Sequence, residues 1–210
     1  MAYFHLVPLH VHSCYSFLEG VPSPQELVEF AKSMGLRALA LTDRNLMVGA
    51  IDFYDACKGV GLQPILGLEI RAGLPLSCTG NLPGKLSASG SLVLLAQNLE
   101  GWSSLCRLSS DLQMGDEDTS LPFERLGEFS TGVICLTGGG AGWLSLLLQG
   151  RKDRQASGCL TRLQELFPDR LYLQLDLSNP AAAAQASRLM DLGKRLGIPC
   201  VPAHPVYTLR

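Results

Sequence analysis

Short apolar runs alternate with longer stretches of mixed apolar and polar residues along the whole chain. The apolar runs predict about seven strands, at residues 6–11, 38–41, 64–70, 91–97, 132–137, 170–177 and 198–203. Apolar residues at helical spacing between these runs predict helices over 24–34, 48–58, 100–110, 141–149, 155–166 and 181–196. Strands that alternate with helices are typical of parallel βα units. We therefore predict the α/β class, with either a βα barrel or a doubly wound sheet.

The first two predicted helices carry the clearest local signals. Ser23 can cap the first helix, and Pro24 suits its first position because that position needs no N–H donor. In the second helix Ile51, Tyr54 and Cys57 recur at intervals of three residues and therefore lie on one side, and Gly59 and Gly61 end the helix.

A single domain over residues 1–210 is the expected organisation for a chain of this length. Segments 72–91 and 111–130 are rich in turn-forming or polar residues, and we expect them to be loop excursions from that domain. Apolar residues make up 47% of the chain and charged residues 17%, which fits a compact core and excludes a disordered chain.

Charge and cysteine usage limit the expected partners and compartment. A net charge of -2 gives no overall attraction to nucleic acid. The seven cysteines never form a Cys-x-x-Cys pair, which indicates reduced thiols and no zinc ribbon or disulfide framework. The N-terminus lacks a signal-peptide pattern, and no apolar run approaches the roughly 20 residues of a membrane helix. We therefore expect a soluble, cytoplasmic protein without a membrane partner.

Polar residues stand where the predicted strands end, which is where parallel α/β folds gather their functional side chains. These residues are His10, His12, Asp43, Arg44, Glu69 and His204. His10 and His12 alternate to the same side of an extended chain, about 7 Å apart, so both imidazoles can reach one metal ion. The alternative is a pair of ordinary histidines held by hydrogen bonds.

Several blocks of the sequence resemble one family, in matching order. They are "LHVHSCYSFLEG", "ALALTDRNLMVGAIDFYDACKGVGLQPILGLEI", "LVLLAQNLEGWSSL", "GVICLTGG" and "IPCVPAHPVYTL". The chain resembles the PHP (polymerase and histidinol phosphatase) domain, most closely the version at the N-terminus of bacterial DNA polymerase III alpha-type chains. The resemblance implies a distorted (β/α)7 barrel, similar to a TIM barrel, with up to three metals at the C-terminal ends of the strands. Active members hydrolyse phosphoesters, and in some polymerases the domain removes nucleotides from a 3′ end.

The ligands that the resemblance implies are only partly present. Four positions keep a donor: His10, His12, Glu69, and Glu19 where the family usually has Asp. Five positions lack the expected ligand: Arg44, Ser91, Gly139, Pro205 and Tyr207. His204 lies one residue before the lost aspartate at Pro205, so we expect it to point to the opposite face. The resemblance therefore implies a vestigial metal site.

Arg44 is the substitution that changes the chemistry most. A guanidinium stays protonated and cannot bind a metal, but it can neutralise Glu19, Glu69 or Asp43. We favour an eroded cluster without catalytic residues, in a domain that acts as a structural and docking module in DNA replication or repair synthesis. The alternative is an active metal-dependent phosphoesterase, 3′–5′ exonuclease-like, in which His10, His12, Glu19 and Glu69 hold one Zn²⁺ or Mn²⁺ ion. The substitutions favour a site without a bound ion over a site that holds Zn²⁺ or Mn²⁺.

The partners follow from the resemblance alone. They are the polymerase body of the same chain, a separate proofreading exonuclease subunit, and DNA only indirectly. The parent chain would be a DNA-directed DNA polymerase, with this domain not catalytic by itself. A stand-alone regulatory or binding module is a third alternative.

Overall fold

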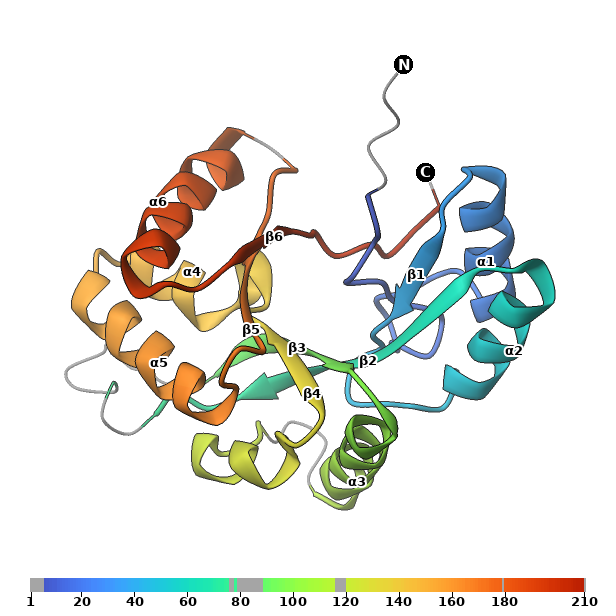
Figure 1. Ribbon diagram of the computed structural model, residues 1–210, viewed down its shortest axis with the longest axis horizontal. Helices are drawn as coiled ribbons and strands as arrows, with labels where there is room; N and C mark the ends of the chain where they lie inside the picture. Colours follow the sequence, from blue (N-terminus) through green and yellow to red (C-terminus); the bar gives the residue numbers. More distant parts are fainter. Residues whose placement is uncertain (1–5, 76–77, 79–88, 116–119, 179, 210) are drawn as a thin grey trace.

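The structure, a computed structural model, describes residues 6–75, 78, 89–115, 120–178 and 180–209. Six strands within these ranges form one sheet in the order β1-β2-β3-β4-β5-β6. They are β1 (Ala38–Leu41), β2 (Gln63–Ala72), β3 (Gly90–Ala96), β4 (Val133–Leu136), β5 (Leu171–Leu175) and β6 (Cys200–Pro202). The sheet curls, and helices cover its outer side (Figure 1). The α/β class is therefore confirmed, with a curled mixed sheet.

The direction of β3 departs from the prediction. β1–β2, β4–β5 and β5–β6 pair in parallel, whereas β3 is antiparallel to both β2 and β4. Ala72 at the end of β2 faces Gly90 at the start of β3, so these two strands are antiparallel neighbours and not the parallel pair of a βα unit. Residues 76–77 and 79–88 of the expected 72–91 loop lie outside the described residues.

The predicted strand at residues 6–11 is wrong. Residues 6–10 are irregular, and Val11 forms only an isolated bridge with Val206. Pro8 interrupts the segment because proline has no N–H to donate to a ladder. The expected seventh strand is therefore missing among the described residues, and a complete (β/α)7 barrel is not confirmed.

Main-chain hydrogen bonds nevertheless hold this segment on two sides. The amides of Ala40 and Thr42, in and just after β1, donate to the carbonyls of residues 8 and 11. On the other side the Val206 amide donates to the His10 carbonyl at 3.0 Å, and the His12 amide donates to the Val206 carbonyl at 2.9 Å. The segment that carries both histidines thus lies between β1 and the chain that follows β6.

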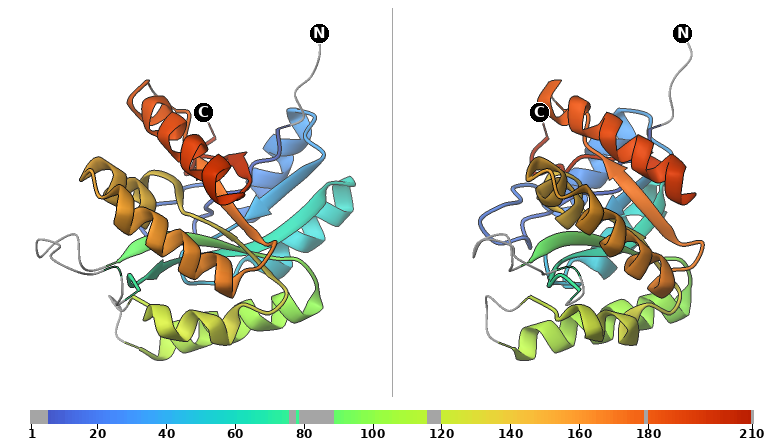
Figure 2. Two further views of the ribbon diagram at one scale, coloured as in Figure 1. Left: turned by 60° about the vertical axis from the view of Figure 1, so that its left-hand side comes forward. Right: turned by 90° about the vertical axis from the view of Figure 1, so that its left-hand side faces the viewer.

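The helices lie close to the predicted positions. They are α1 (Pro24–Ser33), α2 (Ala50–Val60), α3 (Leu99–Met114), α4 (Trp143–Gln149), α5 (Asp153–Leu166) and α6 (Pro180–Leu196), with 3₁₀ turns η2 (Phe123–Phe129) and η3 (Gly139–Ala141). α1 and α2 pack together beside β1 and β2, while α4 contacts both α5 and α6 on the other side (Figure 1). α3 and η2 lie side by side below the sheet (Figure 2). Within the described ranges, no helix has both the length and the apolar character needed to span a membrane.

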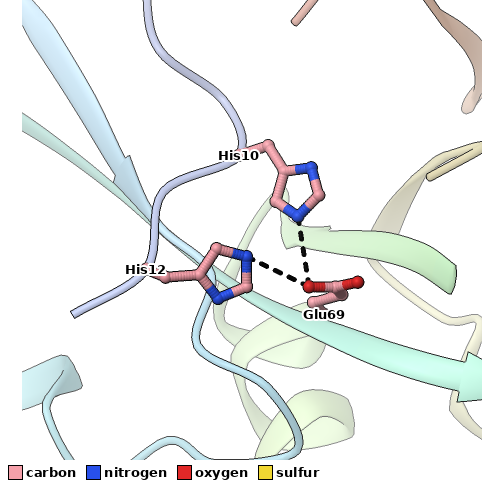
Figure 3. Close-up of side chains that lie close together, drawn as sticks. All are labelled: His10, His12 and Glu69. Atoms are coloured by element: carbon pink, nitrogen blue, oxygen red, sulfur yellow. Dashed lines mark hydrogen bonds and ion pairs between the residues drawn. The ribbon is translucent and has the colours of Figure 1, made fainter. Parts of the chain in front are cut away.

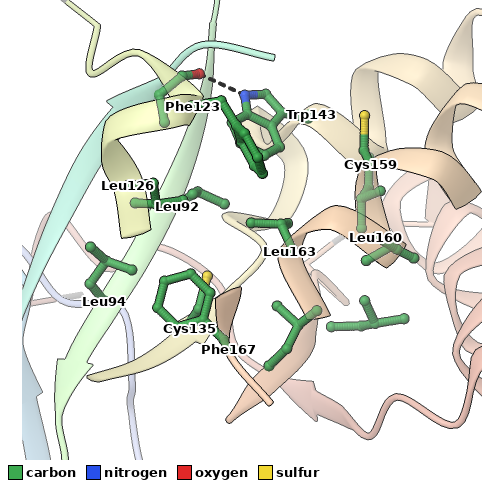
Figure 4. Close-up of a cluster of buried hydrophobic side chains, with 14 of the residues drawn as sticks. Leu92, Leu94, Phe123, Leu126, Cys135, Trp143, Cys159, Leu160, Leu163 and Phe167 are labelled. Carbon is green, nitrogen blue, oxygen red and sulfur yellow. Dashed lines mark hydrogen bonds between the residues drawn. The ribbon is translucent and has the colours of Figure 1, made fainter. Parts of the chain in front are cut away.

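The largest hydrophobic core lies between the sheet and the helices α3 to α6. Phe123 and Trp143 pack there with ring centroids 5.8 Å apart, and the Trp143 indole N–H donates to the Ala72 carbonyl at 2.7 Å (Figure 4). Phe123 and the buried Leu126 and Phe129 belong to η2. The 111–130 segment is therefore not a purely polar excursion, because η2 contributes three side chains to this core.

Candidate metal centre

His10 and His12, in the segment that lies beside β1, converge on Glu69 of β2 (Figure 3). The Nε2 atoms of His10 and His12 lie 3.2 and 3.0 Å from the same oxygen, Oε2 of Glu69. All three side chains are buried, and their donor atoms lie within 4.8 Å of one another. Among the described residues, this is the single group of three or more side chains that could together hold a metal ion.

Main-chain contacts bring Arg44 beside this cluster. Arg44 forms a parallel bridge with Glu69, so the residue that follows β1 and Thr42-Asp43 is fixed next to β2. The neighbouring carboxylate of Asp43 points elsewhere and accepts hydrogen bonds from the Ser13 amide, the Ser13 hydroxyl and the Ser16 hydroxyl, each at 2.7 Å. Asp43 therefore holds the loop after the histidines in place and does not join the cluster.

The Arg44 guanidinium lies between two carboxylates. Its Nη2 lies 3.3 and 3.4 Å from the two oxygens of Glu69, and its Nη1 lies 2.5 Å from Oε1 of Glu19. Glu69 is buried, whereas the side chains of Glu19 and Arg44 are about one-third exposed, at 31% and 29%. The arginine thus connects a buried carboxylate to one at the surface.

Burial and hydrogen bonding act in opposite directions on Glu69. Burial alone would raise its pKa, but the hydrogen bond from His10, the adjacent His12 ring and a hydrogen bond from Ser91 outweigh that effect and hold the pKa far below its usual range. For His10 burial is the largest influence and lowers the pKa below 6.5, while the hydrogen bond to Glu69 partly offsets this. The cluster therefore contains an ionised carboxylate and a neutral His10.

His12 is held from two directions. Its Nδ1 lies 2.8 Å from the Ser16 hydroxyl, and its ring stacks on Tyr207 with centroids 4.6 Å apart and planes inclined by 22°. Its Nε2 is buried and makes no hydrogen bond of acceptable geometry to any described residue, although Glu69 is near. Tyr207, at a position where the resemblance implies a histidine ligand, covers the ring of His12 instead.

The remaining positions named from the sequence lie around this cluster. Ser91 lies near the start of β3 and is buried, and Gly139 is the first residue of η3. His204 is exposed and lines grooves on the outer surface with Pro205, so the structure does not bring it to His10 and His12. The described structure thus gathers His10, His12 and Glu69, joins Glu19 to them through Arg44, and leaves His204 apart.

Gln174 in β5 is a site residue that sequence reasoning missed. It is fully buried, and its Nε2 lies 2.9 Å from Nδ1 of His10 and 3.2 Å from the carbonyl oxygen of Ala203. A signal was present in the sequence, because Gln174 is an uncharged polar residue between Leu173 and Leu175 in an otherwise apolar strand. A polar side chain in a buried strand needs a partner, and here the partner is a histidine of the cluster.

These residues do not fit a multinuclear metal cluster. The described residues supply three converging donors, and a protonated guanidinium contacts both oxygens of the one carboxylate among them. The unpartnered Nε2 of His12 is the feature that would suit a single cation.

Sequence comparison decides the family. The family model for the PHP domain matches residues 8–178. The chain belongs to the PHP domain family. Among curated relatives of this PHP domain, the DNA polymerase III subunit alpha of Treponema pallidum is 37% identical over 99% of the chain and 18% of the relative. The subunit of the same name from Buchnera aphidicola is 33% identical over 97% of the chain and 17% of the relative. An error-prone DNA polymerase of Symbiobacterium thermophilum is 33% identical over 96% of the chain.

The PHP domain therefore spans less than a fifth of the length of these relatives, at 17–19%. Solved structures show the same fold at low sequence identity. An amidohydrolase from Chromobacterium violaceum matches with a TM-score of 0.63 and 11% identity, covering 96% of this chain and 87% of that one. A protein described as a metal-dependent phosphoesterase, from Bifidobacterium adolescentis, matches with a TM-score of 0.61 and 15% identity at the same coverage.

Proposed function

We propose that this PHP domain has a degenerate metal cluster and serves as a structural and docking module of a DNA polymerase III alpha-like protein, in DNA replication or repair synthesis. The observation that carries the proposal is Arg44, whose guanidinium contacts both Glu19 and Glu69. The sequence relatives named DNA polymerase III subunit alpha support the assignment to that kind of parent protein. No side chain of the domain is proposed to be catalytic.

The positive charge of Arg44 is the physical reason for the degenerate cluster. At a separation of about 4 Å and an effective dielectric constant of ~20, two unit charges repel by about 4 kcal/mol, and a divalent ion doubles this before screening. The same guanidinium stabilises the ionised, buried carboxylate of Glu69. Arg44 thus replaces the charge that metal ions supply in a working cluster.

A reduced one-metal site is the second candidate, because the buried Nε2 of His12 lacks a hydrogen bond to any described residue. In this alternative His10, His12, Glu19 and Glu69 would hold one Zn²⁺ or Mn²⁺ ion in a phosphoesterase with 3′–5′ exonuclease-like activity. Three or four protein ligands are enough for a catalytic zinc. The alternative requires Arg44 to leave both carboxylates.

Metal binding and hydrolysis, measured on the same samples, separate the two candidates. The purified chain is equilibrated with Mn²⁺ or Zn²⁺, bound metal is quantified by elemental analysis and calorimetry, and hydrolysis of a chromogenic phosphodiester and of a DNA 3′ end is followed. Arg44→His tests whether the positive charge of Arg44 opposes metal binding. Arg37→His is the matched control because Arg37 is exposed in the loop before β1.

We expect no stoichiometric metal and no turnover for the unchanged chain and for Arg37→His. Arg44→His should bind metal at least tenfold more tightly, since about 1.4 kcal/mol of relieved repulsion already gives that factor. One bound ion per unchanged chain, together with turnover that His12→Ala abolishes, would establish the one-metal enzyme and refute the degenerate cluster.

The proposed docking partner is the polymerase body of the same parent chain, which the much greater length of the relatives supports. A separate proofreading exonuclease subunit is a further proposed partner, with DNA reached only through these proteins. Phe17, Leu18 and Val21, here called the apolar patch, are exposed apolar residues of the loop between His12 and α1, with exposed fractions of 82%, 90% and 71%. Exposed apolar side chains that are close in sequence favour a protein contact at this loop.

A further inference from the structure

The hydrogen-bond partners of Gln174 determine where His10 carries its proton. The carbonyl oxygen of Ala203 can only accept, so the side-chain atom of Gln174 that lies 3.2 Å from it must be the amide nitrogen. The same nitrogen lies 2.9 Å from Nδ1 of His10 and can only donate to it. Nδ1 of a neutral His10 therefore presents a lone pair, and the proton is on Nε2, where it donates to Glu69 at 3.2 Å.

Ser16 fixes the opposite arrangement in His12. The Ser16 hydroxyl donates its proton to the Asp43 carboxylate at 2.7 Å and accepts from the Arg44 amide at 3.1 Å. Toward Nδ1 of His12, at 2.8 Å, this hydroxyl can then only accept, so Nδ1 carries a proton. This proton fixes the orientation of the His12 ring, whose Nε2 lies 3.0 Å from the Glu69 oxygen without a hydrogen bond of acceptable geometry.

We infer that Gln174 is a positioning residue that holds His10 in the tautomer that cannot bind metal through Nε2. His10, His12 and Glu69 converge on one point, yet His10 carries its proton on the nitrogen that faces that point. His12 and Glu69 are then the remaining donors of this group, fewer than the three protein ligands of a catalytic zinc site.

The surroundings of Gln174 are consistent with this role. A Cβ atom added at Gly139, a position where the resemblance implies a ligand, would lie 3.0 Å from the Gln174 nitrogen. Gly139 also has a positive φ of 57°, which a side chain would strain. The present conformation of Gln174 therefore occupies space that a side chain at position 139 would need.

Nitrogen-15 NMR of the histidine rings tests the inference, because protonated and unprotonated ring nitrogens have well-separated shifts. Spectra are recorded with a chelator present, and the signals are assigned from His10→Gln and His12→Gln. We expect His10 protonated at Nε2 and His12 protonated at Nδ1. A His10 that is protonated at Nδ1 in the unchanged chain would overturn the inference.

Gln174→Glu reverses the donor, since a carboxylate can only accept from Nδ1. We expect the Nδ1 signal of His10 to become that of a protonated nitrogen, and Zn²⁺ to bind at least tenfold more tightly, the range typical of residues that orient a metal-binding histidine. Gln97→Glu adds the same charge at an exposed site and should leave both readouts unchanged. An unchanged His10 pattern in Gln174→Glu, or an unchanged Zn²⁺ affinity, contradicts the role of Gln174.

If Gln174→Glu does not fold, Glu69→Ala provides the decisive spectrum. It removes the acceptor at Nε2, so His10 keeps the Nε2 proton only if Gln174 sets the tautomer, and a mixed tautomer overturns the inference. The inference rests on the proposed function in one respect, namely that the cluster is not a working metal site. Stoichiometric metal with turnover in the unchanged chain would refute the proposed function, whereas the NMR pattern of the chelated protein refutes or supports the role of Gln174 separately.

Discussion

Gln174 and Ser16 are not metal ligands, yet the state of both histidines depends on them. From the sequence, the His-x-His pair, Glu69 and the cation at Arg44 could be predicted to belong to one place. The hydrogen-bond directions could not, because they depend on residues 164 positions apart for His10 and Gln174. The tautomer of a histidine is decided by its two partners, and one of them comes from a strand with no sequence link to the motif.

The contacts of Arg44 could likewise be predicted from the sequence only in part. The sequence indicated that Arg44 could neutralise Glu19, Glu69 or Asp43, and the structure places it on the first two. Asp43 is excluded because Ser13 and Ser16 already donate to both of its oxygens. Which of three nearby carboxylates pairs with an arginine is set by competing donors, and these serines carry no signal of that role in the sequence.

The perturbed carboxylate and imidazole predict how stability depends on pH. The pKa of His10 is lowered from 6.5 by burial, so the unfolded chain takes up a proton first and stability should fall as the pH drops below 6.5. The pKa of Glu69 is lowered from 4.5, because hydrogen bonds outweigh burial, so a second loss should follow below pH 4.5. Urea denaturation from pH 7.5 to 3.5 measures both steps.

Two variants assign these steps. His10→Gln should flatten the stability profile just below pH 6.5, and Glu69→Gln should reduce the loss below pH 4.5. If the stability of the unsubstituted domain is constant or rises on acidification through pH 6, the assignment of a neutral, buried His10 is contradicted.

At the scale of elements, the sequence predicted where helices and strands occur better than which way they face. In α2 the spacing places Ile51, Tyr54 and Cys57 on one side, yet Ile51 and Tyr54 are 58% and 41% exposed, and Phe53 is buried with Cys57. The spacing of three residues fits both faces, and the choice is made by packing against α1 and β2. The sequence also did not indicate the direction of β3, because a strand buried on both faces has the same apolar pattern in either direction.

Trp143 links α4 to the end of β2, and its loss should weaken that link. Trp143→Phe removes the indole N–H that donates to the Ala72 carbonyl at 2.7 Å and leaves a buried acceptor without its donor. We expect the free energy of unfolding to fall by about 1–3 kcal/mol in urea denaturation. Trp102→Phe, at a half-buried position on α3, is the control and should cost clearly less. Equal costs for the two variants would show that the bond to Ala72 contributes nothing specific.

At the scale of the whole molecule, the curated relatives of this domain are much longer than the domain, which supports the proposal that its exposed apolar side chains contact a polymerase body. Phe17 and Leu18 are the most exposed of the apolar patch beside the site. The double variant Phe17→Ser, Leu18→Ser should change the stability of the 210-residue chain by no more than about 0.5 kcal/mol, because these side chains contact mainly water. In the full parent chain the same variant should lower the unfolding temperature of the domain.

Calorimetry of both chains tests this prediction. Leu99→Ser with Met114→Ser is the matched control, since these residues are 85% and 89% exposed at the two ends of α3, away from the patch. If the two double variants have the same effect in the parent chain, the loop at residues 17–21 is not the docking surface.

The hydrogen bonds between Val206 and the two histidine residues also affect the order in which this domain folds during synthesis. His10 and His12 leave the ribosome long before Val206, whose main-chain groups bind theirs. Both histidines can therefore reach their native positions only after the segment around Val206 has been synthesised and has packed against them. Contacts between residues so far apart in sequence are typical of a slow folding step.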